Sequence, residues 1–77
     1  MNREKFMSLL QENGIDTDIV SFDSSVDDGY NIRKNRIRWE TFVRDRGKEY
    51  NCIGFPSESD ALEYMLKRLI ELYGKKQ

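Results

Sequence analysis

The most regular hydrophobic pattern in the chain lies near its C-terminal end. Apolar residues recur there at helical spacing, which predicts a helix that begins after Ser57 and ends at Gly74. Ser57 is a favoured N-cap residue, and Asp60 follows three positions later in a capping-box pattern. Pro56 precedes the cap, where a proline does the least harm to a strand. The predicted buried face of this helix comprises Leu62, Met65, Leu66, Leu69, Ile70 and Tyr73.

A shorter helix is predicted near the N-terminal end, over about residues 3–13. Asn2 is a permitted N-cap residue for it. Gly14 stands where a left-handed C′ residue is wanted, and Ile15 follows as the apolar contact of a Schellman ending. Its buried stripe would consist of Phe6, Leu9 and Leu10.

Between the two helices the pattern alternates with the period of a β-strand. Three strands are predicted, at residues 30–33, 37–44 and 49–55. The turn at 34–36 contains an asparagine and the turn at 45–48 contains a glycine, and both residues tolerate positive φ. On the middle strand the alternation assigns Ile37, Trp39, Thr41 and Val43 to one face, and Arg38, Glu40, Phe42 and Arg44 to the other.

These elements predict one α+β domain over residues 1–77, ordered α-β-β-β-α. A sixteen-residue helix spans about 24 Å and an eight-residue strand about 26 Å, so one helix can cover the sheet. We expect a three-stranded antiparallel sheet with both helices on one face, Trp39 in the core and a frayed tail at 74–77. Residues 16–29 show no clear pattern, and a short strand or a single helical turn remains open there.

Charge is segregated along the chain although its net value is −1. Residues 12–28 hold six acids and no base, whereas residues 33–48 hold seven bases and two acids. Such asymmetry concerns surfaces more than fold. The two blocks either contact a partner or form solvated faces whose fields partly cancel.

Several kinds of chemistry lack their usual residues. The chain has no histidine, a single cysteine and five isolated glycines, so the patterns of a general base, a zinc site, a disulfide and a phosphate loop are missing. The acidic block does not match the spacing of a calcium loop. We therefore predict a protein that is not an enzyme, with no cofactor and no metal. Cys52 is expected to be a buried small hydrophobe.

The composition also bears on location. A disulfide-free domain of this size fits a reducing compartment. The first twenty residues include the charged Arg3, Glu4, Lys5 and Glu12, and no apolar run long enough for a signal peptide or a spanning helix. We expect a cytoplasmic protein without a membrane contact.

The candidate partner-binding residues come from both charged blocks. Arginine beside an exposed aromatic is a common composition for the centre of an interface. The alternative for Phe42 is packing beneath the loop of residues 16–29. The candidates are Arg36, Arg38, Glu40, Phe42 and Arg44 on the basic side, and Asp16, Asp18, Asp23, Asp27 and Asp28 on the acidic side.

A set of residues from the middle strand to the last helix carries a family resemblance: Trp39, Glu40, Thr41, Phe42, Arg46, Gly47, Phe55, Ser57, Glu58, Ala61, Tyr64 and Leu66. In these residues the chain resembles small bacterial immunity proteins, which are encoded beside polymorphic toxins and neutralise them by direct binding. The resemblance implies a cognate toxin domain as partner, and we expect a monomer or a weak homodimer. The acidic block would suit a nuclease toxin, and the basic face would suit a toxin with an acidic catalytic centre.

Nucleic acid is the alternative partner. The run from Phe55 to Leu62 resembles the strand-to-helix join of three-stranded-sheet DNA-binding domains in plant ethylene-response factors and phage integrases. An arginine-rich three-stranded sheet can enter a major groove. The acidic pI of about 5.4 opposes this reading.

Overall fold

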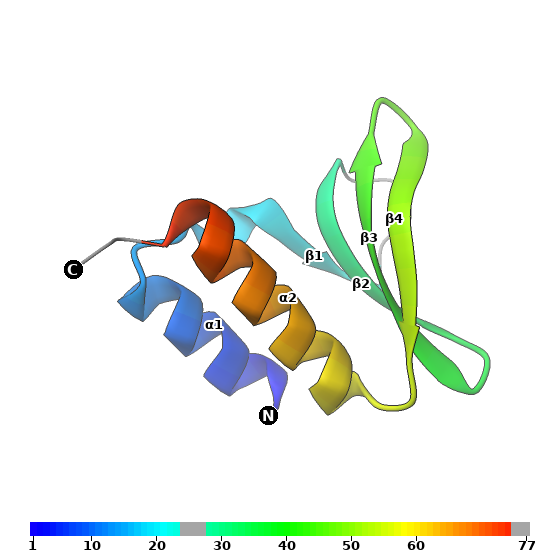
Figure 1. Ribbon diagram of the computed structural model, residues 1–77, viewed down its shortest axis with the longest axis horizontal. Coiled ribbons are helices and arrows are strands. Elements are labelled where there is room, and N and C mark those ends of the chain that lie inside the picture. Colours follow the sequence, from blue (N-terminus) through cyan, green and yellow to red (C-terminus); the bar gives the residue numbers. More distant parts are fainter. Residues whose placement is uncertain (24–27, 75–77) are drawn as a thin grey trace.

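Both helices lie on one face of a four-stranded sheet in the computed structural model of the protein (Figure 1). The structure describes residues 1–23 and 28–74. Helices α1 and α2 lie side by side and run in the same direction (Figure 1). The elements in chain order are α1 (Arg3–Glu12), the 3₁₀ helix η1 (Thr17–Ile19), β1 (Val20–Phe22), β2 (Gly29–Asn35), β3 (Arg38–Asp45), β4 (Lys48–Phe55) and α2 (Glu58–Tyr73).

The sheet has the order β1-β2-β3-β4 and is mixed, which corrects the predicted three-stranded antiparallel sheet. Strand β1 pairs in parallel with β2, with Val20 opposite Tyr30, whereas β2, β3 and β4 are antiparallel neighbours. A three-residue strand is too short to show alternation in the sequence. Gly29, at φ 114°, lets β2 begin close to η1, because a Cβ there would lie 3.0 Å from the carbonyl oxygen of Ile19.

The ends of α1 follow the sequence prediction. Asn2 caps the helix, and its side-chain oxygen accepts a hydrogen bond of 2.8 Å from the amide of Lys5. Gly14 is left-handed at φ 72°, and the amide of Ile15 donates to the carbonyl oxygen of Leu10 over 2.9 Å. This is the Schellman ending that the sequence indicated, with Ile15 buried in the core.

The core lies between the two layers and is shared by nearly every element. Trp39 packs against it from β3, which confirms the predicted core role of this residue. Ser57 caps α2 as predicted, but Ile70 and Tyr73 are exposed rather than buried. The buried cluster consists of Phe6, Leu10, Ile15, Val20, Ile32, Ala61, Leu62, Met65, Leu66 and Leu69.

The turn between β2 and β3 begins two residues later and ends one residue later than the predicted turn at 34–36. Asn35 pairs with Arg38, which leaves Arg36 and Ile37 as the two turn residues. Arg36, and not the predicted asparagine, takes the left-handed conformation, at φ 61°. Ile37 was predicted to begin a strand on the core face, and this was wrong because the shifted turn leaves it 94% exposed.

A β-bulge interrupts the pairing of β3 with β4. Thr41 lies opposite Ile53 and Val43 lies opposite Tyr50, so one extra residue on β4 is accommodated between them. Asn51 has a left-handed φ of 55° at this point. A regular strand over residues 49–55 would place Tyr50 and Ile53 on opposite faces. The bulge instead brings both to the helix side of the sheet, since directly opposed residues share a face.

Candidate binding groove

The outer face of the sheet, which points away from the helices, carries an ion network. Arg33 donates from Nε to Glu40 over 3.0 Å, and its two terminal nitrogens donate to Glu49 over 2.8 and 3.1 Å. Arg38 donates to the other oxygen of Glu40 over 3.1 Å. The guanidinium of Arg33 also lies 4.3 Å from the ring centre of Phe42. Arg33 and Arg38 therefore meet two carboxylates on this face.

Two candidate residues are buried by that network. Phe42 is 1% exposed and Glu40 is 2% exposed. Glu40 was expected to face solvent, which was wrong, whereas burial was one of the two alternatives left open for Phe42. Burial by itself would raise the pKa of Glu40, but hydrogen bonds from Arg33, Asn35 and Arg38 outweigh it and hold the pKa below the ordinary value of 4.5. Glu40 is therefore a buried, charged group whose role is structural, and it is paired with Arg33 and Arg38.

The remaining basic candidates do not form one patch with these residues. Arg38 is exposed beside its ion pair, and Arg44 lies 3.8 Å from Asp28, a candidate of the acidic block. Arg36 stands at the β2–β3 turn, at one end of the sheet. The basic block of the sequence is therefore divided among different places.

The acidic candidates are also dispersed. Asp23 pairs with Arg3 over 2.9 Å, and Arg3 is held in addition by Glu58. The side chain of Asp16 accepts from the amide of Asp18 and caps η1, and both residues are exposed. Asp27 lies outside the described residues. These positions do not identify an acidic binding face.

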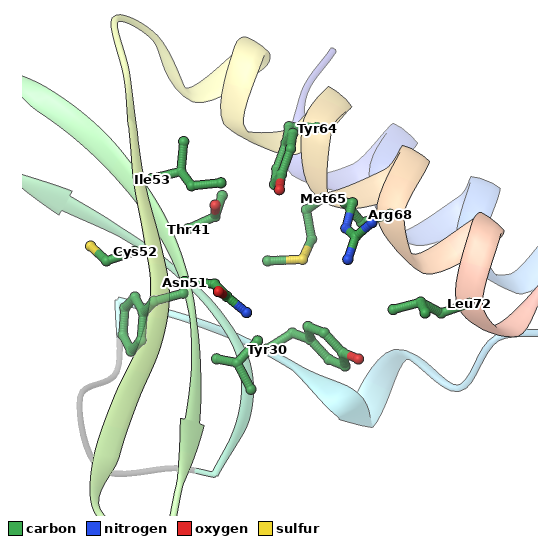
Figure 2. Close-up of a pocket in the computed structure, with 11 residues that line it drawn as sticks. Tyr30, Thr41, Asn51, Cys52, Ile53, Tyr64, Met65, Arg68 and Leu72 are labelled. Atoms are coloured by element: carbon green, nitrogen blue, oxygen red, sulfur yellow. The ribbon is translucent and has the colours of Figure 1, made fainter.

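A groove of about 430 Å³ opens between α2 and the β3–β4 hairpin, on the helix side of the sheet. In Figure 1 the turn between β3 and β4 lies away from α2, which leaves room for this groove between the hairpin and the helix. Figure 2 shows side chains of α2 facing those of the strands across the space. The lining residues are Tyr30, Thr41, Phe42, Val43, Asn51, Cys52, Ile53, Tyr64, Met65, Arg68 and Leu72.

Tyrosine is concentrated at this groove, and all four tyrosines of the chain lie in it or beside it. Tyr30 and Tyr64 line it. Tyr73 joins the hydroxyl of Tyr30 through a hydrogen bond of 2.8 Å. Tyr50 lies opposite Val43, which lines the groove, and is 48% exposed on the same sheet face. Tyrosine offers a rigid apolar body and a polar tip, which makes it common in protein interfaces.

The Tyr30–Tyr73 contact fixes one side of the groove. The two rings meet edge to face with centres 6.1 Å apart. Partial burial and the hydrogen bond with Tyr73 raise the pKa of Tyr30 to about 12, so its hydroxyl stays neutral at physiological pH. This contact ties β2 to the last turn of α2.

The open side of the groove combines apolar surface with one charge. Leu72 is 53% exposed on α2. Arg68 is the one charged side chain among the described residues that line the groove, and its distance of 3.6 Å to Glu71 makes a weak surface pair. The groove was not predicted from the sequence, because the C-terminal helix was expected to cover the whole sheet. Leu72, an apolar residue outside the predicted buried face of that helix, was the one indication of an additional apolar surface.

Cys52 lies on β4 and is exposed, which corrects its predicted burial. Figure 2 places its side chain on the side of β4 that faces away from α2. Partial desolvation and the nearby Glu40 carboxylate raise the pKa of the thiol. A thiol with a raised pKa is mostly protonated at neutral pH and is a poor nucleophile.

Residues 1–23 and 28–74 contain no group of three or more side chains that could together bind a metal ion. No helix within these residues is long and apolar enough to cross a membrane. Comparison with known proteins yields no matching family model, curated protein or solved structure.

Proposed function

We propose that the protein is a non-catalytic inhibitor that binds a cognate protein toxin, and that the groove between α2 and the β3–β4 hairpin is its docking surface. The observation that carries the proposal is the gathering of every tyrosine of the chain around one open groove whose surface is partly apolar and partly polar. Aromatic anchors in a concave site are typical of the centres of protein interfaces. The toxin as partner rests on the resemblance to immunity proteins.

The chemistry of the groove indicates what the partner presents. Tyr64, Met65 and Ile53 offer apolar contact, and Leu72 is exposed at the helix side. Arg68 adds a single positive charge. The complementary segment of the toxin is therefore apolar and carries a carboxylate positioned to meet Arg68.

Protein is favoured over nucleic acid as the partner. The outer sheet face was the surface proposed to enter a DNA groove, and Arg33 and Arg38 on it are engaged with Glu40 and Glu49. A phosphate backbone would have to compete with these carboxylates. The groove has one cation, which is few for phosphate recognition.

The resemblance implies that a toxic domain is encoded next to this gene. The test uses that domain as the probe, with binding measured by calorimetry. Leu72→Asp places a charge in the groove and should weaken binding at least tenfold. Ile70→Asp is the matched control because Ile70 is on α2, is also exposed, at 36% against 53% for Leu72, and does not line the groove. It should bind as the parent does.

Three outcomes would overturn parts of this proposal. If the parent protein does not bind the toxic domain, the function is wrong. If Leu72→Asp and Ile70→Asp bind equally well, the groove is not the docking surface. If the parent sediments as a dimer that Leu72→Asp dissociates, a second copy of this chain occupies the groove instead.

A further inference from the structure

The tip of the β2–β3 hairpin presents an isolated apolar side chain. Asn35 and Arg38 close the hairpin, and Arg36 and Ile37 form the turn between them. Ile37 is 94% exposed, the most exposed of the large hydrophobic residues described. Every residue from Lys34 to Arg38 is exposed, so the tip projects from the body of the sheet (Figure 1).

Neither Arg36 nor Ile37 is a residue type that stabilises a two-residue hairpin turn. Arg36 holds a left-handed φ of 61°, which a residue with a Cβ adopts only at a cost. Ile37 is β-branched, and turns of two residues favour Asn, Asp and Gly. A fully exposed isoleucine contributes nothing to the core. Residues that break local rules without a structural gain point to a functional site.

Cations surround the exposed isoleucine. Lys34, Arg36 and Arg38 lie within the same five-residue stretch. Arg38 pairs with the buried Glu40, and among the described residues no ion pair involves Lys34 or Arg36. The tip therefore presents one exposed apolar side chain among positively charged side chains.

We propose that this tip is a second contact with the partner protein, in which Ile37 enters an apolar pocket rimmed by carboxylates. Charge complementarity selects the acidic rim, because Lys34 and Arg36 have no carboxylate partner of their own in the described part of the chain. The shape of one projecting side chain selects a concave site. The inference rests on the proposed function, since it takes the same toxin as partner.

A protein pocket fits the tip better than the other negatively charged surfaces do. A lipid bilayer holds a peripheral protein through a broad apolar face or two anchoring signals, and one isoleucine supplies neither. A nucleic acid that accepts an apolar wedge also needs a row of phosphate contacts beside it. The described tip offers three cations, and one of them is already paired.

The chain contains its own control for the experiment. Arg46, at the turn between β3 and β4, has a left-handed φ of 52°, close to that of Arg36. Arg36→Gly and Arg46→Gly therefore remove the same charge and the same conformational cost, at different hairpin ends. Both should raise the midpoint of thermal unfolding by a few degrees, or leave it unchanged.

Binding to the toxic domain should separate the two variants. We expect Arg36→Gly to weaken binding several-fold at low salt, and Arg46→Gly to leave it unchanged. Ile37→Asn should weaken binding tenfold or more at both low and high salt, without lowering the thermal midpoint. Leu72→Asp, measured beside them, reports on the groove alone.

The following results would overturn the inference. Unchanged binding of Ile37→Asn, with Leu72→Asp impaired, removes the tip and leaves the proposed function standing. A lowered thermal midpoint in Ile37→Asn assigns the residue a structural role. Retention of the parent on a 20-base-pair DNA duplex or on phosphatidylserine vesicles, abolished by Ile37→Asn, assigns the tip to that partner instead. A parent protein that does not bind the toxic domain removes both proposals together.

Discussion

Glu40 shows most directly how a single residue organises this protein. Its carboxylate is 2% exposed and accepts from Arg33 and Arg38 on the outer face of the sheet. A buried carboxylate is costly unless its partners remain in place. We predict that Glu40→Gln lowers the free energy of unfolding by about 2 kcal/mol, as expected for lost hydrogen bonds to charged groups. Urea denaturation at pH 7 measures this change.

The same residue should make stability depend on acid pH. The pKa of Glu40 is lower in the folded protein than its ordinary value of 4.5. Its stabilising contribution is therefore fully present above pH 4.5 and is lost as the pH falls through the lowered pKa. The parent should lose more stability than Glu40→Gln between neutral and acid pH. Glu63→Gln, at an exposed position of α2, is the control. Identical pH profiles for parent and Glu40→Gln would contradict the prediction.

Tyr30 gives a second titration, at the alkaline end. Its pKa is raised to about 12, by partial burial and by the hydrogen bond with Tyr73. A raised pKa in the folded state stabilises the protein below pH 10, and this contribution is lost as the pH rises from 10 towards 12. Ultraviolet absorbance should show one tyrosine that ionises late. Tyr73→Phe should bring that ionisation to lower pH, and a late tyrosine that persists unchanged in this variant would refute the coupling.

Individual residues were predicted well where a local rule decides their position. Asn2, Gly14 and Ser57 follow from capping chemistry, which depends on a few neighbours in the chain. Ile37 and Cys52 were placed wrongly because their exposure depends on where a turn falls and which strand lies at the edge. These are properties of strand pairing, and a run of alternating residues does not contain them.

At the scale of elements, the N-cap of α2 offers a direct test. The hydroxyl of Ser57 accepts from the amide of Asp60 over 3.2 Å and satisfies a donor at the first turn of the helix. We predict that Ser57→Ala lowers the free energy of unfolding by about 1 kcal/mol. Ser8→Ala, on the exposed side of α1, should have little effect. Equal losses in the two variants, measured by urea denaturation, would show that the cap contributes nothing specific.

The elements that the sequence analysis missed share a physical cause. Strand β1 has three residues and pairs in parallel with β2, so its position depends on a strand that follows it in the chain. The bulge on β4 places Asn51 at a left-handed φ of 55°. Asparagine tolerates this conformation in turns as well as in bulges, so the residue type alone does not locate a bulge. Helices were predicted more completely, because their caps and their apolar spacing are local to each segment.

At the scale of the whole molecule, the candidate site could not be predicted from charge patterning. The charged blocks were interpreted as possible partner-binding surfaces. In the folded protein, however, Arg44 pairs with Asp28, and Arg33 pairs with Glu40 and Glu49. The groove arises from the angle between α2 and the β3–β4 hairpin, which is a tertiary property. Two of its tyrosines lie on α2 and two on the sheet, so they come together through the packing of α2 on the sheet, and the bulge places Tyr50.

Because the core is thin, the stability of the whole molecule depends on the residues that α1 contributes to it. Phe6 is fully buried and meets Phe22 of β1 edge to face, with ring centres 6.0 Å apart. A chain of 77 residues has a total stability of roughly 4 to 12 kcal/mol. Phe→Ala in a core costs about 3 to 5 kcal/mol. We predict that Phe6→Ala leaves a large unfolded population at 37 °C, while Phe6→Leu remains folded.

Hydrogen exchange can show whether that loss is global. Because Phe6 and Leu10 belong to the same cluster as Ile32 and Leu62, α1, the sheet and α2 should open together. Slowly exchanging amides of β2, β3 and α2 should therefore lose protection by the same factor in Phe6→Leu. If α1 alone lost protection while the strands kept theirs, α1 would be an independently unfolding appendage and the core would be held by the sheet and α2 alone.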